Sequence, residues 1–326
     1  MSNVLYSSAR AVVSEKTLFG AERIKRLIDA EKTEDVFKIF AEVNFGGDKT
    51  SDGNFDAENV IKAELDGLMA FIRTDCPDEN FKKLLLYPND FRNAEALVKA
   101  KFLKIAYDGF LSEEGVFGVK YLKDRIFADD YKPLPKFMGD ALGKADKAFV
   151  DKTATGQYIN GLFTKALYDE LFSLKIKNDI LTKILKASAD FINVGIALRV
   201  RNYLVAKGFF VHEGDLNKED LMFFCEKTPE EMKDRFKFKE IYPVLAKGIN
   251  ALDKGKGFSE FETATESYPV VLLKKYRYSS EGYMPFIRFC YYKLADIMNA
   301  RVITVGKNAR LSKDEISARL KEYYEG

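Results

Sequence analysis

The stretch ADFINVGIALRVR, residues 189–201, places two polar residues, Asp190 and Asn193, inside an otherwise apolar run. Both are poorer helix formers than most of their neighbours. The three- and four-residue spacing of the apolar residues nevertheless predicts a helix. An apolar helix retains such residues only where their side chains find hydrogen-bond partners. The Asp and Asn therefore indicate a specific contact.

The pattern occurs three times in the chain. Residues 90–101 read DFRNAEALVKAK, residues 190–201 read DFINVGIALRVR, and residues 296–307 read DIMNARVITVGK. Each copy has Asp first, Asn three residues later, an apolar or small residue after seven and a base after eleven. The starts lie 190 − 90 = 100 and 296 − 190 = 106 residues apart. At about 100° per residue these four offsets share one helix face, and the spacing predicts a repeated helical unit.

The polar positions of this stripe are the candidate interaction residues of the chain. An Asp near the start of a helix and a base near its end both match the helix dipole. We expect the side chains to fix helix packing within each unit, and direct contact with a partner protein is the alternative. In the third copy, Gly306 is expected to end the helix and to leave Lys307 outside the stripe. The candidates within the stripe are Asp90, Asn93, Lys101, Asp190, Asn193, Arg201, Asp296 and Asn299.

The rest of the chain also reads as helix. Residues 158–174, YINGLFTKALYDELFSL, carry one apolar stripe. Thr228 and Ser312 each begin a capping box, with Glu three residues later. Polar or proline-rich breaks fall at 44–56, 128–136, 211–220 and 253–258. We expect an all-α fold of three helical units, at residues 1–127, 128–212 and 213–326.

The composition limits the partners. The 52 basic and 50 acidic residues nearly cancel, so the chain has no global field to attract nucleic acid or anionic lipid. The three cysteines are few and far apart, as in a protein of a reducing compartment. No run approaches the roughly 18 apolar residues that span a bilayer, and we expect a chain that does not itself cross a membrane.

Signs of catalysis are sparse. The single histidine, His212, has no second histidine for metal binding or proton relay. The acidic loop 48–59 resembles a calcium loop but ends on Asn59 where a bidentate carboxylate is needed. We therefore expect no catalytic residue, no metal, no cofactor and no small-molecule substrate.

Three segments carry a family resemblance. The segments YSSARAVVSEKTL (6–18), ADFINVGIALRVR (189–201) and PFIRFCYYKLADIMNARVITVGKNARLSKDEISARL (285–320) together resemble the C subunit of the bacterial and archaeal V-type (A-type) rotary ATPase, whose eukaryotic counterpart is the d subunit. The resemblance runs nearly end to end. Its most specific residues are Tyr6, Ala9, Arg10, Glu15, the repeated Asp-x-x-Asn, Asn299, Arg301, Gly306 and Lys307.

The resemblance implies a fold and a role. Members of that family are all-helical, with three similar units arranged as a funnel around a pseudo-threefold axis. They have no nucleotide site, lie on the cytoplasmic face of the ring of membrane proteolipids and receive the end of the shaft made by the D and F subunits. Arg301 joins the candidate interaction residues on this basis. The alternatives are a cytosolic helical-repeat adaptor and an all-α enzyme with a site between units.

Overall fold

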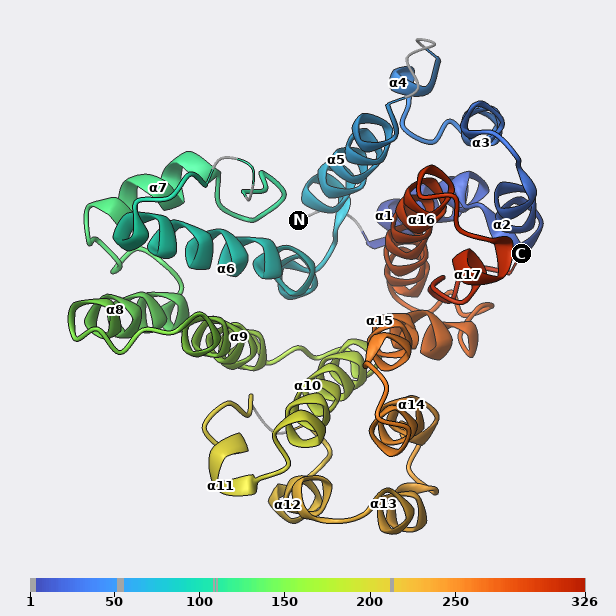
Figure 1. Cartoon of the computed structure of the whole chain (residues 1–326). Coiled ribbons are helices and arrows are strands. Elements are labelled where there is room, and N and C mark those ends of the chain that lie inside the picture. Colours follow the sequence, from blue (N-terminus) through green and yellow to red (C-terminus); the bar gives the residue numbers. More distant parts are fainter. Residues whose placement is uncertain (1–3, 52–55, 108, 110, 212–213, 326) are drawn as a thin grey trace. The chain divides into compact units, whose positions relative to one another are not determined.

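The computed structural model describes residues 4–51, 56–107, 109, 111–211 and 214–325. Within these residues the chain forms helices joined by turns and contains no strand (Figure 1). The all-α class expected from the sequence is confirmed. The helix expected at 158–174 is also present, as α9 (Gly156–Ser173).

The chain divides into two compact units. The first combines residues 1–77 with residues 257–326, and the second comprises residues 78–256. One boundary falls in the break at 253–258 that the glycines and lysines of that stretch indicate. The division into three units at 1–127, 128–212 and 213–326 stays a prediction.

The first unit is built around one long buried helix, α16. Nearly all sides of this helix are buried, as in a helix enclosed by others. It contacts α1, α3, α5, α15 and α17. The helical elements of this unit are α1 (Val4–Ser14), the 3-10 turn η1 (Glu15–Thr17), α2 (Gly20–Asp29), α3 (Thr33–Glu42), α4 (Asp48–Ser51), α5 (Ala57–Asp75), α15 (Ser259–Lys274), α16 (Met284–Asn308) and α17 (Lys313–Ser317).

Two buried cations fasten the N-terminal segment to α16. Arg288 donates to the Glu15 carboxylate at 2.8 and 3.0 Å. Lys293 forms an ion pair with Glu64 and donates to the Thr17 carbonyl at 3.1 Å. Because both cations are at most 5% exposed, loss of either partner would leave a buried charge unpaired.

The second unit contains two groups of neighbouring helices. In one group α6 contacts α7, α8 and α9, and in the other α10 contacts α11, α12 and α14 (Figure 1). The helices are α6 (Glu79–Leu103), α7 (Val119–Phe127), α8 (Lys136–Val150), α9, α10 (Asp179–Val200), α11 (Tyr203–Ala206), α12 (Lys218–Glu226), α13 (Pro229–Phe236) and α14 (Tyr242–Asp253).

The expected helix starts are observed. Thr228 caps α13 and Ser312 caps α17, and each forms a reciprocal capping box with the Glu three residues later.

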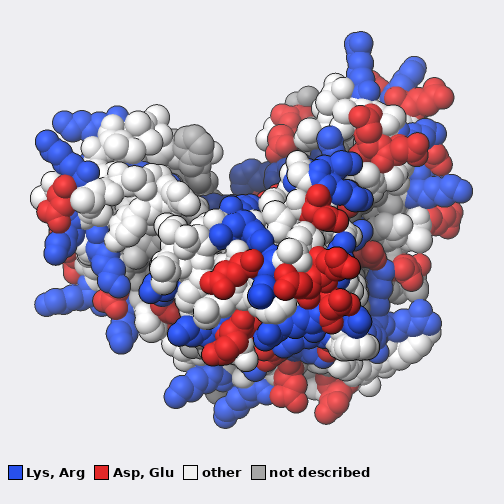
Figure 2. Space-filling view, turned by 60° about the horizontal axis from the view of Figure 1, so that its bottom comes forward, with Lys and Arg blue, Asp and Glu red and all other residues white. Residues whose placement is uncertain are grey.

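Basic and acidic side chains both occur on the face of the molecule seen in Figure 2.

Candidate functional site

The three Asp-x-x-Asn pairs lie on the buried faces of α6, α10 and α16. The six side chains, each at most 1% exposed, are those of Asp90, Asn93, Asp190, Asn193, Asp296 and Asn299. The hydrogen bonds that they form with neighbouring segments go to backbone groups outside their own helix. Burial of these polar groups is therefore compensated by bonds to the chain itself.

Each Asp of the second unit binds the start of a neighbouring helix. Asp90 accepts from the amides of Val116 and Phe117 at 2.8 and 3.0 Å, just before α7. Asp190 accepts from the amides of Asp215 and Leu216 at 2.9 and 3.1 Å, just before α12. The carboxylate thus lies close to the positive end of the neighbour's dipole.

Each Asn pairs in both directions with a single backbone residue. Asn93 donates to the Ser112 carbonyl at 2.7 Å and accepts from its amide at 2.9 Å. Asn193 bonds Val211 at 3.5 and 2.9 Å in the same way. Asn299 bonds Lys321 at 3.1 and 2.8 Å. A primary amide has the donor and the acceptor that this pairing requires, and a carboxylate does not.

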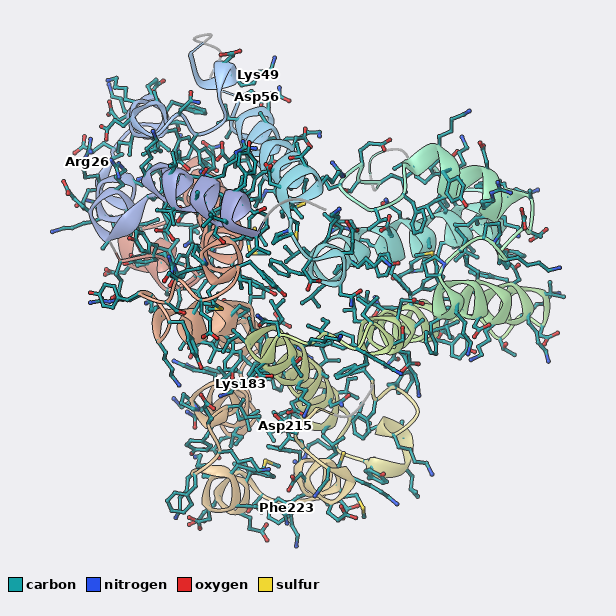
Figure 3. The ribbon with its side chains drawn as sticks, turned by 180° about the vertical axis from the view of Figure 1, so that it is seen from behind. Arg26, Lys49, Asp56, Lys183, Asp215 and Phe223 are labelled. Atoms are coloured by element: carbon teal, nitrogen blue, oxygen red, sulfur yellow. The ribbon has the colours of Figure 1, made fainter. Side chains whose placement is uncertain are left out.

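The base at the eleventh offset lies at the other end of the same neighbouring helix. Arg201 donates to the carbonyls of Phe224 and Lys227 at 2.7 and 2.6 Å, at the end of α12. Lys101 bonds the Asp129 carboxylate, which directly follows the C-cap of α7, and reaches Asp146 at 3.3 Å. Asp215, labelled in Figure 3, lies just before α12, and Phe223, also labelled there, lies in the last turn of α12.

We call this arrangement a helix clamp: the Asp bonds the start of a neighbouring helix, the base bonds its end, and the Asn pairs with a further backbone segment outside that helix. Eleven residues of helix rise about 16 Å. The bracketed helices have 9 residues in α7 and α12. Since a 9-residue helix is about 14 Å long, the two charged side chains reach both of its ends.

The third helix clamp is assembled from both ends of the chain. Asp296 accepts from the Phe19 amide at 2.8 Å, at the start of α2, while Asn299 bonds Lys321 near the C-terminus. Lys307 donates to the carbonyls of Ile28, at 2.9 Å, and Ala30, at the end of α2. The clamped helix α2 and the segment that Asn299 bonds thus come from opposite ends of the sequence.

The carboxyls differ in their partners and in their pKa. Burial raises the pKa of Asp190 to about 6, against the lowering effect of its two amide bonds. Burial raises the pKa of Asp296 to about 7, against the lowering effects of Lys293 and of its one amide bond. The Oδ1 atom of Asp296 has no hydrogen-bond partner among the described residues. The third helix clamp therefore holds its Asp with one bond fewer.

One expectation about the third copy is wrong. Helix α16 does not end at Gly306 but continues to Asn308, which keeps Lys307 on the stripe. A Cβ at Gly306 would lie 2.7 Å from Cγ1 of Ile316, so the glycine permits close packing of α17. Arg301, by contrast, is exposed and bonds Glu58 of α5 at 3.1 Å. Lys307 and not Arg301 holds the end of α2.

Sequence reasoning missed two glycines that the helix clamps need. A Cβ at Gly115 would lie 2.0 Å from Oδ1 of Asp90, and a Cβ at Gly214 would lie 2.4 Å from Oδ1 of Asp190. Only glycine fits there without displacement. A signal was present, because a Glu-Gly dipeptide follows each Asp at 115 − 90 = 25 and 214 − 190 = 24 residues.

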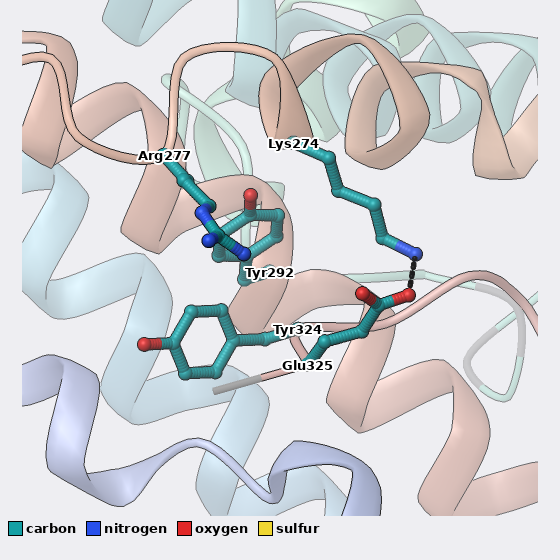
Figure 4. Close-up of a pocket in the computed structure, with 5 residues that line it drawn as sticks. All are labelled: Lys274, Arg277, Tyr292, Tyr324 and Glu325. Carbon is teal, nitrogen blue, oxygen red and sulfur yellow. Dashed lines mark hydrogen bonds and ion pairs between the residues drawn. The ribbon is translucent and has the colours of Figure 1, made fainter.

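Other candidate chemistry is limited in the described part of the chain. No three His, Cys, Asp or Glu side chains gather there as metal ligands. His212 and residues 52–55 of the acidic loop lie outside the described residues. A pocket of about 180 Å³ in the first unit is lined by Lys274, Arg277, Tyr292, Tyr324 and Glu325 (Figure 4). Lys274 donates to Glu322 and to Glu325, each at 2.7 Å, which neutralises much of its charge.

The family model of the ATP synthase (C/AC39) subunit matches residues 7–319. The chain belongs to this family. The match to the C/AC39 family spans all three Asp-x-x-Asn pairs and their bases, and it supports the resemblance to the C subunit of the V/A-type ATPase. No curated protein matches the chain. Among the described residues of this C/AC39 member, no helix has the length and apolar character needed to traverse a bilayer.

Proposed function

We propose that the chain is the non-catalytic central-stalk component that couples the D–F shaft to the proteolipid ring of a V/A-type rotary ATPase. It would lie at the cytoplasmic side of the membrane as a peripheral part of the complex. The observation that carries the proposal is the family match over residues 7–319. The shaft and ring as partners follow from the family resemblance.

The helix clamps support a mechanical role. A coupling protein transmits force between two partners, so its helices must not slide along one another. In the helix clamp of α10, for example, hydrogen bonds hold the start of α12, the backbone segment that precedes it, and its end. Since the Asp and Asn side chains of the three pairs are buried and bond backbone groups of the chain itself, we assign them to stiffness rather than to chemistry at a substrate.

Reconstitution with purified partners tests the proposal. The chain should bind a purified D–F complex and a detached proteolipid ring separately, and it should join the two in a single particle on size-exclusion chromatography. The Asp124→Ala variant is a control that should bind both partners as wild type does. The Asp124 side chain is 64% exposed, and its ion pair with Lys120 is long, at 4.0 Å. If wild-type chain at micromolar concentration binds neither partner, the proposal is wrong.

A further inference from the structure

Three buried ionisable side chains meet at the third helix clamp. Lys293 and Asp296 lie three residues apart on α16, so they share one face of that helix. Glu64 of α5 forms an ion pair with Lys293 and also acts electrostatically on Asp296. The side chains of Lys293 and Glu64 are 5% and 13% exposed, and Asp296 is fully buried. We call these three residues the α16 charge cluster.

The α16 charge cluster holds one cation for two carboxyl groups. Glu64 has the ion pair with Lys293 and also accepts from the Gly46 amide at 2.6 Å. Asp296 accepts one amide bond, from Phe19, and its Oδ1 has no hydrogen-bond partner among the described residues. With all three groups charged, the cluster would bury one net negative charge, which costs far more than burying a neutral carboxyl. One bound proton removes this charge, and Asp296, with fewer partners, is the carboxyl that takes it.

The surroundings of Asp296 agree with a proton held there. Burial is the main cause that raises the pKa of Asp296 to about 7; Glu64 adds to the rise, while Lys293 and the Phe19 amide oppose it. Other charged side chains on the elements packed around α16 are matched in pairs: Arg10 with Asp75, Arg23 with Glu42, Arg288 with Glu15 and Lys321 with Glu266. The balance of charge at Asp296 is therefore set within the α16 charge cluster.

We propose that the start of α2 is fastened to α16 by a proton-dependent contact, which holds while Asp296 is protonated and loosens when Asp296 ionises. Phe19, whose amide bonds Asp296, directly precedes α2. Separation of this segment from α16 lets water reach the carboxylate, so ionisation favours separation. The charge-assisted bond to the Phe19 amide offsets only part of the cost of the buried charge. The inference concerns the chain by itself and goes beyond the proposed function.

The other two helix clamps are built differently at this point. In Asp90 and in Asp190 both carboxylate oxygens accept a backbone amide. An ionised Asp is better stabilised by two such bonds than by one. The proton-dependent contact is therefore assigned to the third helix clamp, which holds the N-terminal segment.

Hydrogen exchange at pH 6 and pH 8 measures the contact. The pKa of Asp296 is about 7 in the closed segment, against about 3.9 for an Asp in water. Linkage then gives a rise of about tenfold in the opening constant of residues 20–29 between the two pH values, after correction for the pH dependence of intrinsic exchange. Exchange in α15 of the same unit should show no such rise. Asp296→Asn keeps an acceptor for the Phe19 amide and cannot ionise, so its opening constant should not rise.

Two further variants separate a proton-dependent contact from ordinary packing. Glu64→Gln leaves Asp296 as the one carboxyl group beside Lys293, so the rise in opening should move to lower pH. Glu58→Gln is the matched control on α5, because the Glu58 side chain is 64% exposed, and its rise should occur at the pH of wild type. Infrared difference spectra between wild type and Asp296→Asn should show a protonated carboxyl band at pH 6 that is lost by pH 8.

Several results would overturn the inference. It is wrong if wild type and Asp296→Asn show the same rise in opening, or if the protonated carboxyl band is absent at pH 6. It is also wrong if Glu64→Gln leaves the pH of the rise unchanged, which can be measured even where Asp296→Asn does not fold. A rise of equal size in α15 would show that the whole unit opens. These measurements use neither shaft nor ring, so their failure leaves the proposed function standing.

Discussion

Replacing Asp190 by alanine should destabilise the second unit more at acid pH than at neutral pH. The side chain is 1% exposed and accepts two backbone amides. Without it these amides lose their acceptor, and an unsatisfied buried donor costs about 1–3 kcal/mol. At pH 7.5, however, the wild-type carboxylate is ionised in a buried site, which is itself unfavourable. We expect a net cost of about 1–2 kcal/mol at this pH.

The pH dependence follows from the pKa of Asp190. Burial raises it to about 6 in the folded chain, against about 3.9 in an unfolded one. Between these values the folded chain binds more protons, so the stability that this group contributes is present at low pH and is lost as the pH rises through 6. From pH 7.5 to pH 4.5 the wild type gains about 2 kcal/mol through this group, and Asp190→Ala gains nothing through it.

Urea unfolding of wild type and Asp190→Ala at pH 4.5 and pH 7.5 measures the effect. The cost of the substitution should be larger by about 2 kcal/mol at pH 4.5. Asp124→Ala, at an exposed position of the same unit, should cost at most about 0.5 kcal/mol at either pH. A cost for Asp190→Ala that is equal at the two pH values, or larger at pH 7.5, would refute the reasoning.

Three further substitutions examine the other parts of the helix clamps. Asp296→Asn keeps an acceptor for the Phe19 amide but cannot ionise. Because burial raises the pKa of Asp296 to about 7, wild type loses stability as the pH rises from 5 to 8, and the variant should lose less in urea titrations. A steeper loss in the variant would contradict this. Gly214→Ala places a Cβ 2.3 Å from the Lys186 carbonyl oxygen and should cost about 1–3 kcal/mol, whereas Gly208→Ala, with its nearest atom at 3.6 Å, should cost about 1 kcal/mol or less in the same assay. Arg201→Met removes two bonds to carbonyls at the end of α12 and should speed hydrogen exchange there while exchange in α8 stays unchanged.

The sequence predicted the helical stripe but not what the stripe holds. The offsets of Asp, Asn and base are local, so helix geometry places them on one face without knowledge of the fold. Which backbone amides they bind depends on the path of the chain after the helix, and no periodicity encodes that path. For the third copy the difficulty is greatest, because Phe19 and Lys321 belong to opposite ends of the chain. Gly306 shows a related limit: its preference for helix ends is overridden by packing against Ile316.

The stiffness of a helix clamp depends on holding both ends of one helix. A helix bonded only at its start could slide or tilt along its neighbour at small cost. With the Asp190 bonds at the start of α12 and the Arg201 bonds at its end, a shift of one residue, about 1.5 Å, would stretch hydrogen bonds at both. The contacts go to backbone atoms, so they fix the helix axis whatever the exposed side chains of α12 do. Surface positions can therefore vary to suit a partner while the mechanical element persists.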